Sequence, residues 1–136
     1  MILIDNGVIK LDYDPATDIL YVNYPDLHGY LVPEINYNID IIVDQVRSYD
    51  VKNMLLDARQ TVISIDKDAS RKVAVYLASS LSKTRLKKVA RVASPNPDLE
   101  KRSEGTIHEI NSTINLPFQL HSFTDVEEAV SWLKMK

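Results

Sequence analysis

A group of polar side chains follows the short apolar run Met54–Leu56 and has the residue types of a binding or regulatory site. It combines two acids, a guanidinium and two hydroxyls: Asp57, Arg59, Thr61, Ser64 and Asp66. Ser94 and Asn96 follow the next predicted strand. Open α/β sheets bind ligands outside the carboxyl ends of their strands, so we expect both segments to share one working surface. The same residue types also form turns and cap helices, which is the alternative.

Two kinds of chemistry are open to this predicted loop. Arg59 either forms a salt bridge with Asp57 or Asp66, or holds a phosphate through its two-pronged guanidinium, and the salt bridge is favoured of the two. Phosphorylation of Thr61 or Ser64 would place negative charge near a predicted helix start, where anions are stabilised. The loop is therefore a candidate regulatory site.

The sequence lacks the patterns that catalysis or metal binding requires. Its three histidines, at positions 28, 108 and 121, do not have the spacing of a metal-binding pair. The absence of cysteine excludes thiolate ligands, disulfides and cysteine nucleophiles. No nucleophile elbow is present, and three glycines form no phosphate-cradling loop. We therefore expect a protein that is not an enzyme and that needs no metal or cofactor.

Positive charge is concentrated in residues 69–97, which carry seven basic and no acidic side chains although the net charge of the chain is −3. The densest part is a basic patch of four residues: Lys83, Arg85, Lys87 and Lys88. Cations at a helix C-terminus are favoured by the helix dipole, and the acidic first half offers neutralisation. The patch would also suit an anionic membrane surface or an acidic protein. A pI of about 5.6 and the lack of a basic-aromatic platform argue against nucleic acid.

The first 24 residues predict an antiparallel β-meander. Asn6-Gly7 favours a type I′ hairpin, and the segment Asp14–Asp18 predicts a second turn. The run Ile19–Tyr24 is rich in β-branched and aromatic residues, as strands are.

The rest of the chain predicts helices that alternate with short apolar strands. Helices are expected from 33 to about 48–50, from 66 or 68 to 81, from 97 behind a capping Asn96, and after a capping box at 124–127. The strands between them are expected at 54–57, 88–93 and 118–123, the last as a core strand. This order predicts an α/β fold with a mixed sheet, in which an N-terminal meander precedes parallel strands.

The chain has the size of one domain, and we expect residues 1–136 to form it without an internal linker. The N-terminus has no signal-peptide pattern, and no apolar stretch approaches the roughly 20 residues of a membrane span. These features, with the lack of cysteine, predict a cytoplasmic protein.

Two segments, LLDARQTVISID at 55–66 and FTDVEEAVSWLK at 123–134, resemble parts of the STAS (anti-sigma-factor antagonist, or SpoIIAA-like) domain. The resemblance extends over almost the whole chain as a pattern of elements. It implies that the loop after the first apolar strand delivers a phosphorylatable hydroxyl to a helix start. Here the matching pair is Asp66-Lys67, so a lysine stands where switch members have serine or threonine.

The resemblance implies a non-catalytic regulatory module that binds a protein partner or a second copy of itself. The alternative is a protein that binds or senses a small apolar or lipid-like molecule, as distant groups of this fold do. A cavity in the structure would favour the ligand, whereas a closed core would favour the interaction module.

Overall fold

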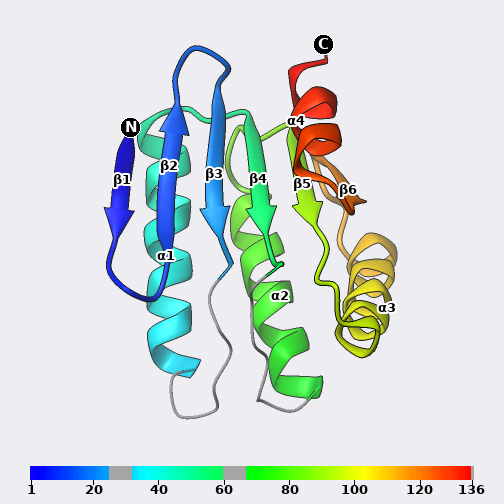
Figure 1. The fold of residues 1–136 in the computed structure, drawn as a ribbon. Coiled ribbons are helices and arrows are strands. Elements are labelled where there is room, and N and C mark those ends of the chain that lie inside the picture. Colours follow the sequence, from blue (N-terminus) through cyan, green and yellow to red (C-terminus); the bar gives the residue numbers. More distant parts are fainter. Residues whose placement is uncertain (25–31, 60–66, 136) are drawn as a thin grey trace.

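A mixed β-sheet forms the centre of the computed structural model, which describes residues 1–24, 32–59 and 67–135 (Figure 1). Six strands of the described chain lie in sequence order across the sheet. Antiparallel pairing joins β1 (Ile2–Asp5), β2 (Lys10–Asp14) and β3 (Ile19–Asn23). Parallel pairing then adds β4 (Asn53–Asp57), β5 (Lys88–Val92) and β6 (Gln119–Phe123). The predicted fold class, a meander followed by parallel strands in an α/β fold, is confirmed.

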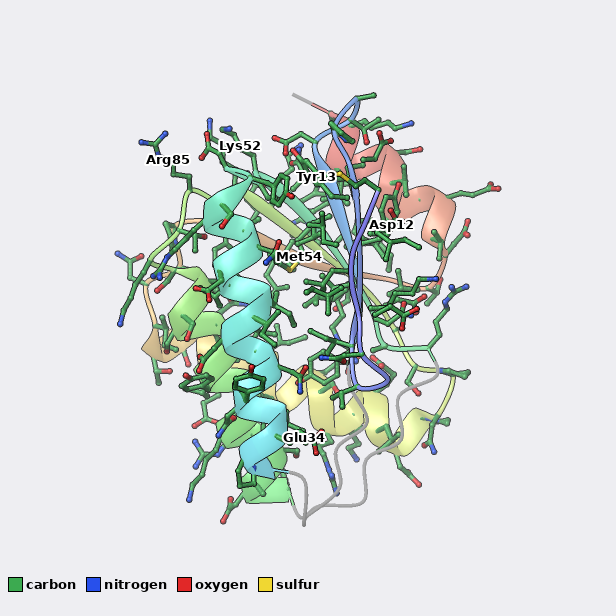
Figure 2. All side chains as sticks on the ribbon, turned by 90° about the vertical axis from the view of Figure 1, so that its left-hand side faces the viewer. Asp12, Tyr13, Glu34, Lys52, Met54 and Arg85 are labelled. Atoms are coloured by element: carbon green, nitrogen blue, oxygen red, sulfur yellow. The ribbon has the colours of Figure 1, made fainter. Side chains whose placement is uncertain are left out.

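Helices cover both faces of this sheet. The described helices are α1 (Val32–Ser48), α2 (Lys67–Leu81), α3 (Pro97–Thr113) and α4 (Val126–Lys134). In Figure 2, α1 and α2 lie on one side of the strands and α4 on the other. Strands that advance in one direction with crossovers of one hand place their connecting helices on the same face. The helix that follows the last strand is free of that constraint and covers the opposite face.

The alternation of side chains along β4 connects these two layers. Met54 and Leu56 belong to the larger core beneath α1 and α2, and Met54 points toward α1 in Figure 2. Leu55 points the other way, into a smaller core that it forms with Ala129 and Leu133 of α4. All three β4 side chains are buried, which confirms a strand covered on both faces. Each such side chain contributes roughly 1.5–3 kcal/mol by leaving water.

The turn between β1 and β2 differs from the predicted type I′ hairpin. Gly7 has a positive φ of 84°, but Asn6 does not. Instead the Asn6 side-chain oxygen accepts hydrogen bonds from the amides of Val8 and Ile9, both at 3.0 Å. This side-chain turn lengthens the connection to Asn6–Ile9, so the type I′ prediction was wrong.

Two other predictions near the C-terminus need correction. β6 is the last strand of the described sheet, and its side chains are exposed or half-buried, so it is an edge strand and not a core strand. The cap of α4 is Asp125, which accepts a hydrogen bond from the amide of Glu127 at 3.2 Å. The Thr124 capping box was therefore placed one residue too early.

Two glycines provide a matched test of this backbone. A Cβ at Gly7 or Gly105 would meet nothing within 4 Å, so both changes to alanine are free of steric conflict. Gly7→Ala should lower the free energy of unfolding by about 1–2 kcal/mol, because its φ lies in the left-handed region. Gly105→Ala, inside α3, should raise it by up to about 1 kcal/mol through helix propensity. Urea unfolding measures both changes in the free energy of unfolding. Two changes of the same sign would contradict the different backbone conformations assigned to Gly7 and Gly105.

Candidate functional site

The Asp57–Arg59 pair closes the carboxyl end of β4. Arg59 donates to both carboxylate oxygens of Asp57, from Nε to Oδ1 at 2.9 Å and from Nη2 to Oδ2 at 2.7 Å. These hydrogen bonds from Arg59 hold the pKa of Asp57 below its ordinary value, against the opposing effect of burial. The salt bridge favoured by the sequence is thus confirmed, with Asp57 as the partner. Half of the Arg59 side chain is exposed, so the pair contributes little stability.

Ser94 and Asn96 begin helix α3. The side-chain oxygen of Asn96 accepts from the amides of Asp98 at 3.0 Å and Leu99 at 3.3 Å, which makes it the N-cap. The Ser94 hydroxyl accepts from the Asn96 amide at 3.2 Å. The capping alternative is therefore confirmed for these two residues.

The remaining residues of the predicted loop, Thr61, Ser64 and Asp66, lie outside the residues that the structure describes. Lys67 is exposed and begins α2. The proposed phosphorylation of the loop stays a prediction.

Part of the predicted basic patch gathers at the amino edge of the sheet. Lys83 and Arg85 line a shallow groove with Arg47 and Asp50, where α1 and α2 end. Arg85 Nη1 lies 3.7 Å from Asp50 Oδ2, and Lys52 Nζ lies 3.1 Å from the same oxygen. Figure 2 shows Arg85 and Lys52 projecting outward beside the end of α1. The helix dipoles favour cations at this position.

Lys87 is exposed and lies directly before β5. Lys88 does not belong to the group that Lys83 and Arg85 form. The Lys88 amine donates to the carbonyl oxygens of Trp132 and Met135 at the end of α4. It also lies 5.3 Å from the centroid of the Trp132 ring. Lys88 thus fastens α4 to the sheet on the face opposite α1 and α2.

An apolar cavity of about 120 Å³ lies between α2, α3 and the sheet. Side chains from all three form its walls, among them Leu56, Leu77, Val89, Ile110, Phe118 and Leu120. In the sheet, Leu56 lies opposite Arg91 on the neighbouring strand, and both line the cavity. The cavity therefore lies on the face of the sheet that α2 and α3 cover, and half-buried residues of α3 leave it partly open to the surface.

Small side chains on the two facing helices leave this space unfilled. Ala74 and Ala78 face it from α2, and Ser103 and Thr106 face it from α3. Figure 2 shows α3 crossing one end of the sheet, while α1 and α2 run along the strands. Within α3 only Ile110 is buried. Leu99, Ile107 and Ile110 of α3 also line the cavity, so α3 fills part of this volume, and the short side chains leave the rest open.

A half-buried ion pair holds α3 against β5 beside the cavity. Arg91 Nη1 donates to Glu100 Oε2 at 2.9 Å, and Nη2 donates to Oε1 at 2.7 Å. The Ser94 amide donates to the same Oε1 at 2.7 Å. Burial alone would raise the pKa of Glu100, but the bonds from Arg91 and Ser94 outweigh it and keep that pKa below its ordinary value. Fewer than a fifth of either side chain's surface is exposed.

Tyr24 lies at the same end of the cavity. Burial raises the pKa of Tyr24 to about 12, although the positive charge of Arg91 acts in the opposite direction. The phenol therefore stays protonated at neutral pH. Its backbone amide donates to the carbonyl oxygen of Asp57 at 3.0 Å, which links the cavity to the end of β4.

A second ion pair attaches α3 to α2. Arg71 Nη1 lies 3.1 Å from Glu109 Oε1, and both side chains are more than a third exposed. Together, Arg91–Glu100 and Arg71–Glu109 hold both halves of α3.

Of the residues that line this cavity, Ser94 was predicted as a site residue, whereas Arg91, Ala74 and Ala78 were not. Arg91 was one signal, because it interrupts the apolar strand Val89–Val92 on the side that faces the helices. Alanines at 74 and 78, spaced by one helical turn, were another. Neither signal reveals a cavity without the placement of α3, which no local pattern specifies.

Among the described residues, no group of three or more histidine or acidic side chains is arranged to hold a metal ion. None of the described helices combines the length and apolarity needed to cross a membrane. Comparison of the chain with family models, curated proteins and solved structures gives no match. The resemblance to STAS domains therefore stays a prediction from sequence.

Replacement of the α3 cap distinguishes a structural from a binding role. Asn96→Ala should lower the free energy of unfolding by about 1 kcal/mol, because two amides lose their acceptor. Asn96→Ser retains a capping oxygen and should restore most of that loss. Urea unfolding of the three proteins measures the effect, and an alanine variant as stable as the wild type would contradict the capping role.

The ion pair predicts a pH-dependent stability. Glu100→Gln should cost about 2–3 kcal/mol at pH 7, since it leaves the Arg91 charge half-buried and unpaired. The folded pKa of Glu100 is lowered, so its contribution is complete above about 4.5 and is lost as the pH falls through the folded value. The difference in the free energy of unfolding between the wild type and Glu100→Gln should therefore become smaller below pH 4.5.

Urea unfolding from pH 7 to 3 measures that gap. Glu104→Gln, an exposed change on the same helix, is the matched control and should have little effect at any pH. A gap for Glu100→Gln that stays constant over the range would show that the carboxylate is not responsible.

Proposed function

We propose that this protein binds a small apolar molecule in the cavity between α2, α3 and the sheet. The observation that carries the proposal is the cavity itself, whose walls are mostly apolar and include a few polar residues, Arg91 among them. An apolar enclosure with a few convergent polar groups is the usual form of a small-molecule site. Of the two functions that the sequence left open, this geometry supports ligand binding better.

The size of the cavity indicates the size of the ligand. A dry cavity of about 150 Å³ lined by Leu, Ile and Phe accommodates benzene or xenon. The volume here, about 120 Å³, is close to that, and most of its lining is apolar, with two arginines and several hydroxyls beside the apolar side chains. A single ring or a short alkyl chain matches this space, and a longer chain would have to extend outside it.

The interaction-module hypothesis has separate support. The exposed cations around Arg85 and Lys83 would complement an acidic protein or membrane surface at the amino edge of the sheet. A homodimer is a further form of this hypothesis. These readings do not conflict with a ligand in the cavity, because the groove and the cavity are lined by different residues.

Benzene provides a direct test of the cavity. Titration into the wild-type protein should shift the amide NMR signals of cavity-lining residues in a saturable manner and should raise Tm, because a ligand that binds only the folded state stabilises it. Ala78→Leu places a larger side chain in the cavity from α2 and should abolish both effects. Lys72→Leu adds the same side chain on the exposed side of α2 and should leave them intact.

Two results would refute the proposal. One is the absence of any saturable change in the wild type up to the aqueous solubility of benzene. The other is an Ala78→Leu variant that binds benzene as tightly as the wild type. Native mass spectrometry of protein from its own host would in addition give the mass of any retained ligand.

A further inference from the structure

The cationic groups at the cavity are already engaged within the protein. Among the described residues that line it, the charged ones are Arg91 and Arg102. Arg91 forms a two-pronged pair with Glu100, with N–O distances of 2.9 and 2.7 Å. Arg102 has an interaction partner as well. The guanidinium of Arg91 thus brings its own counter-ion to the cavity wall.

This arrangement penalises a charged ligand of either sign. A carboxylate or phosphate would have to displace Glu100 from Arg91 or be buried beside the Glu100 carboxylate. An ammonium group would be buried beside the Arg91 guanidinium. Removal of an ion from water without a compensating partner costs several kcal/mol, whereas an apolar body loses nothing by entering.

Uncharged polar groups remain on the α3 side of the cavity. The hydroxyl-bearing residues Ser94, Ser103 and Thr106 line it there, close in sequence to the paired Arg102. Hydroxyls donate and accept hydrogen bonds without a net charge, so they suit an alcohol or carbonyl group.

We infer that the ligand is an uncharged molecule, with an apolar body of about six carbon atoms and at most one hydroxyl or carbonyl group. This inference rests on the proposed function, since it specifies the occupant of the same cavity. The Arg91–Glu100 pair acts as the selectivity element, because Glu100 balances the positive charge of Arg91 at the cavity wall. Fatty acids, phosphorylated lipids and amines are rejected on that ground.

A matched series of six-carbon probes tests the inference. Hexan-1-ol, hexanoate and hexylamine differ in their head group, and at pH 7 they are neutral, negative and positive. Amide NMR titrations should give a Kd for hexan-1-ol at least about tenfold lower than for either ion, equivalent to 1.4 kcal/mol or more. Hexanoate or hexylamine binding as tightly as the alcohol would overturn the inference.

Two variants identify the residue that sets the preference. Glu100→Gln leaves the Arg91 charge without its carboxylate, so the variant should bind hexanoate about tenfold more tightly than the wild type does. The double variant Arg91→Gln/Glu100→Gln has the same change at position 100 but lacks the Arg91 charge. The gain in hexanoate affinity should therefore disappear. Unchanged hexanoate affinity in folded Glu100→Gln would show that the pair does not control selectivity.

The outcomes separate this inference from the proposed function. If benzene binds and hexanoate is preferred over hexan-1-ol, the cavity is a ligand site and only the neutral class is wrong. If neither benzene nor any member of the series binds, the proposed function fails and the inference fails with it.

Discussion

The ion pair between Arg91 and Glu100 holds the start of α3 against the sheet. It connects the carboxyl-terminal part of β5 to the first turn of α3, at the point where the chain leaves the sheet. Because the Ser94 amide shares the same carboxylate, the loop between strand and helix is fixed as well. The ion pair and the Asn96 cap thus both act on the first turn of α3. A helix placed in this way crosses the sheet and leaves the cavity open beneath it.

The cavity is only partly enclosed, because Ser103, Thr106 and Ile107 of α3 line it and are half-buried. Unfilled volume beside a core removes packing contacts and so lowers stability. Small residues at Ala74 and Ala78 maintain the void, although larger ones would fill it. The arrangement is consistent with a site that is kept open for an occupant.

Local patterns in the sequence predicted the elements well. The wholly apolar Met54–Leu56 run predicted a strand buried on both faces, and Asn96-Pro97 predicted a capped helix start. Both signals involve residues close together in the chain. The turn at Asn6 and the cap of α4 were wrongly predicted although both are local, because neighbouring residues offer more than one turn or cap. The prediction of β6 as a core strand failed because distant segments decide the order of the strands, which makes β6 an edge.

The candidate site was harder to predict for the same reason. Asp57 and Arg59 are two residues apart, and their salt bridge was expected. Arg91 and Glu100 are on different elements, and their pairing depends on the angle at which α3 leaves the sheet. A cavity is also defined by volume that side chains do not occupy. Alanine at position 78 reads in the sequence as an ordinary core residue, and its role depends on the short side chains of α3 opposite.

The sparse attachment of α3 has a consequence for the motions of the protein. The helix fully buries one side chain and is held in part by two ion pairs, of which Arg71–Glu109 is open to solvent and to screening by salt. Units with few buried apolar contacts detach from a fold at a lower free energy than the global unfolding free energy. The wall that encloses the cavity is thus among the least stable parts of the described domain. Subglobal opening of α3, measured by amide hydrogen exchange, would then limit the rate at which molecules enter and leave the core.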